Sequence, residues 1–188
     1  MQFDDGHNDW DDNEFPIAYL ITFRTYGTWL HGDERSSTRR NKRSVLKLKR
    51  IEPNVPFEDL MRERMEHGPI VLNREQRKAV QEAIKEFCKA KGCKLYAINV
   101  RTNHVHVVIG VQAKPERVAD ALKAAATKRL RELGLISSES KVWSRGRSRR
   151  YLWKERHVSA AIDYVLYCQS DVPFELDDWD VLIRLSWV

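Results

Sequence analysis

The sequence predicts one α+β domain in which an antiparallel sheet packs against helices, with an additional helix near the C-terminal end. Two kinds of hydrophobic spacing indicate this class. Stretches in which apolar and polar residues alternate are typical of strands, and stretches with apolar residues three or four positions apart are typical of helices. Both kinds follow one another along a chain of 188 residues, a length that suits one compact core.

The first part of the chain contains one predicted strand and one predicted helix. The strand covers residues 18–24, whose letters AYLITFR alternate and end before a Tyr-Gly pair. Residues 28–73 form a long basic insertion with glycine and proline breakers and little regular pattern, so we expect a functional or mobile loop there. Helical spacing predicts a helix over 74–91, which Gly92 is expected to end.

The second part completes a recognisable order of elements. Two strands are predicted over 94–100 and 104–111, joined by three polar residues that are few enough for an antiparallel hairpin. A helix over 115–133, a short strand over 151–153 and a last helix over 157–169 follow. Apart from the last helix, this is the β-α-β-β-α-β plan of a ferredoxin-like sandwich, in which the first and third strands are central neighbours.

Charge is distributed unevenly along the chain. The net charge is +6, but residues 1–16 contribute −6 and residues 171–188 contribute −4, so the region between them carries +16. Such a field favours a polyanion, and nucleic acid is the commonest one in a cell, although a basic surface kept for solubility is the alternative. We expect an acidic tail over 1–16, the main domain over 17–170 with its insertion, and an acidic extension over 171–188.

Cysteine usage and hydropathy indicate the compartment. The 3 cysteines form no CxxC pair, which argues against a disulfide framework and against a zinc ribbon. No run of about 18 apolar residues occurs, and the acidic start is unlike a signal or transit peptide. We therefore expect a cytoplasmic protein with no membrane segment, associated with the nucleoid if the host is bacterial.

His104 and His106 are the candidate metal ligands. Side chains alternate along a strand, so both imidazoles project from one face, roughly 7 Å apart, while Val105 and Val107 lie on the opposite, apolar face. Two such rings can chelate an ion, and a phosphate substrate with oxygen co-ligands favours Mg²⁺ or Mn²⁺. The alternative is a pair of half-buried structural histidines with backbone partners.

A phosphoryl-transfer reaction at such an ion also needs a nucleophile. Tyr164 and Tyr167 of the last helix are the candidates, because a metal that neutralises a phosphate oxygen lets an oriented phenol attack. The amide oxygen of Gln169 is a possible third ligand. The alternative for either tyrosine is the ordinary one, a packed ring with a solvated hydroxyl.

A basic and aromatic segment over 141–156 suits single-stranded or hairpin DNA, because guanidinium groups bind phosphates and rings stack on splayed bases. Trp143 and the other aromatic residues are equally consistent with core anchors beside a solvated charge run. The turn before His104 offers further polar residues that could bind phosphate or orient a ligand. The predicted DNA-binding residues are Arg101, Asn103, Arg145, Arg147, Arg149, Arg150 and Lys154.

Four ordered stretches, LITFRTYGTWLHGDER, NVRTNHVHVVIG, RYLW and AIDYVLYCQ, together resemble the single-tyrosine HUH transposase family. This is the insertion-sequence 200/605-like group, which includes the REP-associated tyrosine transposases. The resemblance implies a ferredoxin-like domain, usually a homodimer, that cleaves and rejoins single-stranded DNA near hairpins. It also implies that His104 and His106 bind Mg²⁺ or Mn²⁺ and that Tyr164, with Tyr167 as the alternate, forms a 5′-phosphotyrosine.

The chain departs from the family's pattern at the third metal ligand. That polar residue usually falls four positions after the tyrosine, where this chain has Cys168, and Gln169 is the fifth. Two other functions stay open at this point. One is a host-adopted nucleic-acid-binding protein that no longer cleaves; the other is a ferredoxin-like HxH phosphoesterase, which would need a second HxT- or HxS-type repeat that is not obvious in the sequence.

Overall fold

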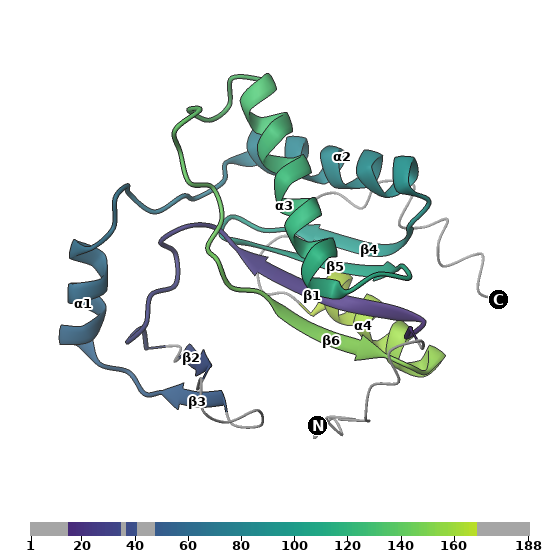
Figure 1. The fold of residues 1–188 in the computed structure, drawn as a ribbon, viewed down its shortest axis with the longest axis horizontal. Coiled ribbons are helices and arrows are strands. Elements are labelled where there is room, and N and C mark those ends of the chain that lie inside the picture. The colour runs from purple at the N-terminus through teal and green to yellow at the C-terminus, as the bar shows by residue number, and fades with distance from the viewer. Residues whose placement is uncertain (1–14, 35–36, 41–47, 169–188) are drawn as a thin grey trace.

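The computed structural model describes residues 15–34, 37–40 and 48–168, so the predicted acidic tails lie almost entirely outside the described residues. The chain passes through a four-stranded sheet, a smaller two-stranded sheet and four helices (Figure 1). In order, the elements are β1 (Ala18–Arg24), β2 (Ser37–Arg40), β3 (Leu48–Ile51), α1 (Val55–Glu63), α2 (Arg74–Lys91), β4 (Lys94–Val100), β5 (His104–Gly110), α3 (Pro115–Glu132), β6 (Ser148–Leu152) and α4 (Glu155–Tyr167).

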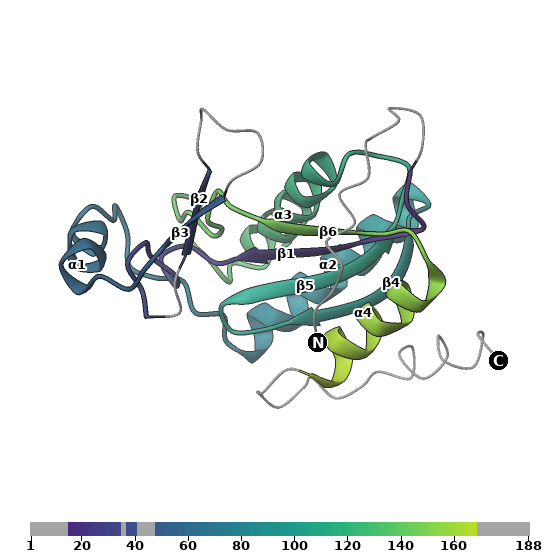
Figure 2. The ribbon, with the colours of Figure 1, turned by 90° about the horizontal axis from the view of Figure 1, so that it is seen from below.

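The larger sheet has the predicted arrangement. Its strand order is β4-β5-β1-β6, and each neighbouring pair is antiparallel, so β1 and β5 are the central neighbours. Helices α2 and α3 cover one face of this sheet and α4 lies on the other (Figure 2). The predicted α+β class, with an extra helix after the β-α-β-β-α-β units, is therefore confirmed.

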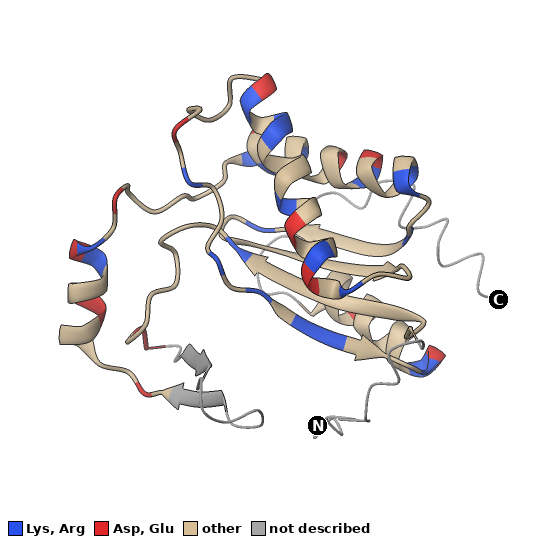
Figure 3. Cartoon of the chain, viewed as in Figure 1, with Lys and Arg blue, Asp and Glu red and all other residues tan. Residues whose placement is uncertain are grey.

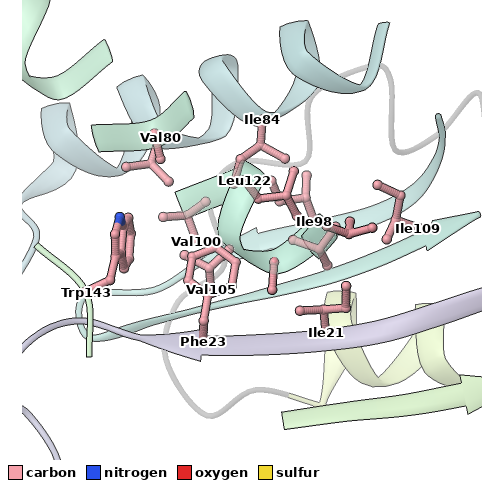
Figure 4. Packing of buried hydrophobic residues seen from close by; sticks show 14 of the residues in the cluster. Ile21, Phe23, Val80, Ile84, Ile98, Val100, Val105, Ile109, Leu122 and Trp143 are labelled. Carbon is pink, nitrogen blue, oxygen red and sulfur yellow. The ribbon is translucent and has the colours of Figure 1, made fainter. Parts of the chain in front are cut away.

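The main core lies between the sheet and the pair of helices α2 and α3. Strand pairing sets Phe23 opposite Val105 and Ile21 opposite Val107, so side chains of both central strands point to the same face. They pack against α2 and against Leu122 of α3 (Figure 4). Each fully buried aliphatic or aromatic side chain contributes about 1.5–3 kcal/mol to folding, so this face holds β1 and β5 firmly in register.

Helix α2 begins and ends where the sequence predicts. At its start the Asn73 side chain accepts a hydrogen bond from the backbone N–H of Gln76, and the Gln76 side chain accepts one from the backbone N–H of Asn73. At its end Gly92 has φ 64°, a left-handed conformation that glycine adopts without a steric cost. Local capping chemistry is therefore sufficient to define this helix.

The expectation of little regular structure in the insertion was wrong. It contains α1 and the β2-β3 hairpin, which lie to one side of the larger sheet (Figure 1). Asn54 caps α1 by accepting a hydrogen bond from Phe57 N–H, and Pro56 lies in the first turn, where no intrahelical donor is needed. No residue of α1 is buried. Phe57, Leu60 and Met61 do follow helical spacing, but Pro53 and Pro56 were interpreted as breakers.

The bounds of four other elements also differ from the prediction, among them α3, which ends at Glu132 instead of 133. Strand β6 begins at Ser148 instead of 151, because pairing with β1 extends into basic residues that carry no apolar alternation. Helix α4 covers 155–167 instead of 157–169, and β5 ends one residue earlier than expected, at Gly110. None of the helices in the described part of the chain combines the length and apolar character needed to cross a membrane.

Candidate metal and nucleophile site

Strand β5 presents its two histidines on the sheet face that α4 partly covers. The ring centroids of His104 and His106 are 4.6 Å apart, with the planes at 83°. Two imidazoles that share one ion have centroids no more than about 6.5 Å apart, because each ligating nitrogen lies about 2.1 Å from the ion. The pair therefore has the spacing of a chelate, and the predicted common face is confirmed.

Hydrogen bonds orient both rings through the same atom. His106 Nδ1 lies 2.7 Å from Thr22 Oγ1, and His104 Nδ1 lies 2.6 Å from Asn103 Oδ1. An amide oxygen only accepts hydrogen bonds, so Asn103 holds the proton of His104 on Nδ1 and leaves Nε2 with its lone pair; the Thr22 hydroxyl can do the same for His106. Ligating histidines typically have this arrangement, in which the second nitrogen donates to an oxygen.

The two histidines differ in exposure. His106 is 5% exposed, whereas His104, at the start of the strand, is half-buried. The described residues contain no group of three or more His, Cys, Asp or Glu side chains placed to hold a metal. Among His, Cys, Asp and Glu side chains of the described residues, His104 and His106 are therefore the candidate ligands at this site.

Tyr164 reaches the histidine pair from α4 of the same chain. Its ring centroid is 5.5 Å from that of His106, with the planes at 79°, and 43% of the residue is exposed. The ring of Tyr164 therefore contacts a candidate ligand while the residue as a whole stays partly open to solvent. Tyr167, the alternate nucleophile, is 46% exposed at the last position of α4. Gln169 lies outside the described residues, so its role as a ligand stays a prediction.

The face that carries the histidines also carries residues that the sequence analysis missed. Strand pairing places Thr22 and Asn99 on either side of His106, and Arg24 beside His104. Each of these side chains stands on the same face as the histidine that it pairs with. Asn99 was detectable as the one amide in the apolar strand KLYAINV, whereas Thr22 and Arg24 had no signal before the register of β1 on β5 was known.

Arg24 is held by an aromatic residue of the insertion. Its guanidinium carbon lies 3.1 Å from the ring centroid of Trp29, a cation–π contact that fixes a positive charge next to His104. The adjoining loop is anchored on α1, because Gly32 has φ +97° and packs so closely on Asn54 and Glu58 that a Cβ atom there would clash with their backbone. Folded parts of the insertion therefore border the site.

The basic segment before α4 is divided between the two faces of the sheet. Arg147 makes a two-oxygen ion pair with Asp120 of α3, and Arg149 pairs with Glu116, also of α3. Both arginines thus pair with α3, which covers the face opposite the histidines and carries acidic as well as basic residues (Figure 3). Arg150 pairs with Leu20 of β1 and so projects to the histidine face. The exposed Arg145 and Lys154 flank β6 at its two ends.

Arg101, one of the predicted DNA-binding residues, is buried. It is 2% exposed, and its backbone N–H donates to His104 O in the turn between β4 and β5. A phosphate could meet this guanidinium only if the side chain became exposed, and the DNA-binding role of Arg101 stays a prediction. Asn103, two residues later, is half-buried and bonded to His104, which matches the ligand-orienting role considered for it.

Trp143 is a core anchor, as the alternative interpretation proposed. It is 8% exposed and packs edge-on against Phe23, while its Nε1 donates to Lys123 O and Thr127 Oγ1. Lys123 is buried as well, and its Nζ donates to the carbonyl oxygens of Ser144 and Gly146. Burial, followed by repulsion from Arg147, lowers the pKa of Lys123 to about 8. These contacts attach the chain before β6 to α3.

Comparison with known proteins identifies one family, and the remote structural likenesses include two transposases. Residues 67–166, more than half of the chain, match the family described as IS200-like transposases. A candidate transposase from Deinococcus radiodurans superposes with a TM-score of 0.45 at 13% identity, covering 85% of this chain and 92% of that one. A REP-associated tyrosine transposase bound to a REP hairpin gives 0.45 at 11%, covering 85% and 70%. No curated protein matches the chain.

Proposed function

Because the chain belongs to the IS200-like transposase family, we propose that it is a DNA endonuclease and strand transferase that acts on single-stranded or hairpin DNA through Tyr164. The observation that carries this proposal is the contact between Tyr164 and His106 within one chain, beside a second histidine on the same face. A nucleophile at a chelating pair is the minimum that a metal-assisted attack on a phosphodiester requires.

Mg²⁺ or Mn²⁺ fits the residues present. Nε2 of His104 and of His106 would hold the ion, since Nδ1 of each ring is bonded to an oxygen. When bound, the ion withdraws electron density from a phosphate oxygen and makes the phosphorus more susceptible to attack. The proposed third ligand Gln169 would add a carboxamide oxygen, a donor type that suits both ions.

The proposed reaction conserves the energy of the phosphodiester. The Tyr164 hydroxyl oxygen forms a bond to phosphorus as the bond from phosphorus to the 3′ oxygen breaks. The phenolic proton passes to solvent, and the departing oxygen takes up a proton to become a free 3′-hydroxyl. The product is a 5′-phosphotyrosine, and attack by the 3′-hydroxyl of a second strand reverses the step. Neither direction needs a nucleotide cofactor.

Positive side chains on the histidine face would guide the DNA. Arg24 pairs with His104 across the strands, and Arg150 projects to the same face from β6. Lys154 follows at the start of α4. Guanidinium and ammonium groups at such positions bind phosphates without reading sequence. Arg147 and Arg149, which pair with α3, are expected to contribute less, because DNA would have to compete with Asp120 and Glu116. A homodimer, as implied by the family resemblance, stays part of the proposal.

A covalent adduct tests the proposed chemistry. The full-length protein is incubated with Mn²⁺ and a DNA hairpin that has a single-stranded flank, then boiled in detergent. The label is at the 3′ end of the DNA, so that it stays on the fragment that becomes joined to tyrosine. We expect a labelled protein band for the wild type and for the matched control Tyr167→Phe, and none for Tyr164→Phe. Loss of the band only in Tyr167→Phe would move the nucleophile to that residue. Tight binding without any band, under Mg²⁺ or Mn²⁺, would favour a non-cleaving binding protein.

A mixing experiment separates attack within one chain from attack across a dimer. His106→Ala and Tyr164→Phe proteins are each expected to be inactive. Since Tyr164 contacts His106 of its own chain, mixing the two should restore no adduct. Recovery of the adduct in the mixture would show that tyrosine and histidines of different subunits form the working site.

A further inference from the structure

Asn99 is a buried amide on the histidine face of β4. It is 6% exposed and pairs directly with His106 across the strands. It reaches this position through a β-bulge: Leu95 pairs with Ile109 and Ala97 with Val108, so Tyr96 is an extra residue. Without that extra residue, alternation would place Asn99 on the apolar core face together with Leu95.

One end of the Asn99 amide secures the helix that carries the tyrosine. Its Nδ2 donates a 2.9 Å hydrogen bond to Val165 O, in the last turn of α4. Carbonyl groups of a last helical turn lack partners within the helix, so Asn99 caps α4 one residue after Tyr164. Because a carbonyl oxygen only accepts, this bond also fixes which end of the amide is nitrogen.

The other end of the amide has an unmet hydrogen-bonding capacity. Asn99 Oδ1 is buried, and none of the described residues donates a hydrogen bond to it. A buried amide oxygen without a hydrogen bond destabilises the folded chain, because folding removes it from water without a replacement partner. Cross-strand neighbours have Cβ atoms about 4.5–5.5 Å apart, so the side chains of Asn99 and His106 are direct neighbours on this face.

We propose that Asn99 Oδ1 is an oxygen donor to the divalent cation held by His104 and His106, directly or through one water molecule. This inference rests on the metal centre of the proposed function. A neutral carboxamide oxygen is a hard donor that suits Mg²⁺ and Mn²⁺. One amide would then bind the ion by its oxygen and hold α4 by its nitrogen, so the position of Tyr164 is linked to the position of the ion.

The test measures Mn²⁺ binding by full-length protein without DNA, from the electron paramagnetic resonance signal of free Mn²⁺. Asn99→Leu and Asn99→Asp both lose the bond to Val165, but only Asn99→Asp keeps an oxygen. We expect Asn99→Leu to weaken binding by about 10-fold or more, as loss of a coordinating or ligand-orienting group does, and Asn99→Asp to bind at least as tightly as the wild type. The matched control is Gln81→Leu, a similarly buried amide on α2, which should bind normally.

Further variants separate this proposal from the metal centre itself. If His106→Ala abolishes binding and Asn99→Leu does not weaken it, the centre stands and the role of Asn99 is overturned. If neither His104→Ala nor His106→Ala changes binding, or the wild type binds no Mn²⁺, the centre and the role of Asn99 both fail. Should Asn99→Leu not fold by circular dichroism, Asn99→Asp decides: binding weaker than wild type overturns the proposal. Gln169→Leu tests the other candidate oxygen in the same assay.

Discussion

The two faces of the larger sheet are built from the same strands but perform different tasks. On β5, Val105, Val107 and Ile109 turn to the dry core under α2 and α3, while His104 and His106 turn to the face that α4 partly covers. Because alternate side chains share one backbone, the packing that fixes the valines also fixes the histidines. The pleat of a single strand thereby places the main core on one face and the proposed metal ligands on the other.

The polar face is nonetheless ordered by specific bonds. Thr22 and Asn103 bond the histidine rings, and Asn99 bonds α4. The same face also holds a smaller apolar cluster, the α4 core, in which Val108 and Leu152 pack with Val158 and Val165 of α4. On the core face under α2 and α3, polar groups are exceptions such as Lys123. The difference teaches that a substitution on one face should change folding and leave chemistry intact, and that a substitution on the other should do the reverse.

The largest expected effect is on the polar face. His106→Leu removes one of the proposed ligands but adds an apolar side chain near the α4 core, so we expect cleavage to fall by at least about 1,000-fold with no loss of stability. Adduct formation rate and melting temperature measure the two effects. His67→Leu, which changes an exposed histidine of the insertion, is the control and should keep its activity. Substantial cleavage by His106→Leu would contradict the proposal that the histidine face carries the chemistry.

A substitution on the core face is expected to have the opposite pattern of effects. Ile109→Ala leaves a cavity in the main core, and we expect the free energy of unfolding to drop by about 2–5 kcal/mol, measured by urea denaturation. Mn²⁺ affinity of the folded fraction should stay unchanged. Ile17→Ala, at a position that is 39% exposed, is the matched control with a much smaller loss. A large change in metal affinity for Ile109→Ala would show that the faces are coupled.

A smaller effect is expected from the bond behind His106. Thr22→Val keeps the shape of the side chain but removes the hydroxyl bonded to His106 Nδ1. Loss of such a ligand-orienting group typically weakens metal binding by about 10- to 100-fold. Thr22→Ser keeps the hydroxyl and should restore most of the affinity in the same Mn²⁺ titration. If Thr22→Val and Thr22→Ser bind Mn²⁺ equally tightly, the hydroxyl does not orient the His106 ring.

The smallest effect concerns Lys123 on the core face. Burial lowers its pKa from 10.5 to about 8 in the folded chain. Below pH 8 both states hold the proton; above it the unfolded chain binds more protons, so the Lys123 contribution to stability rises until about pH 10.5, by at most about 1.4 kcal/mol per pH unit. Urea denaturation of wild type and Lys123→Met across this range gives the difference. Identical slopes would contradict the lowered pKa.

Much of the framework follows from the sequence because local forces define it. The bounds of β1 and α2 were predicted to the residue, since alternation and capping residues act over a few positions. Helix α1 was missed because prolines interrupt its short helical spacing, and the start of β6 was missed because it has no apolar alternation. The basic residues of β6 show what a sequence pattern cannot decide. Alternation separates Arg149 from Arg150, but only pairing with β1 decides which of them faces the histidines.

By itself the sequence determined that two imidazoles share a face of one strand and that a tyrosine follows on a helix. The tertiary structure decided which residues stand beside them. Alternation is a property within a strand, whereas register, bulges and helix docking depend on how distant segments pack. The extra residue at Tyr96 brought Asn99 to the histidine face, and the docking of α4 placed Tyr164 on His106.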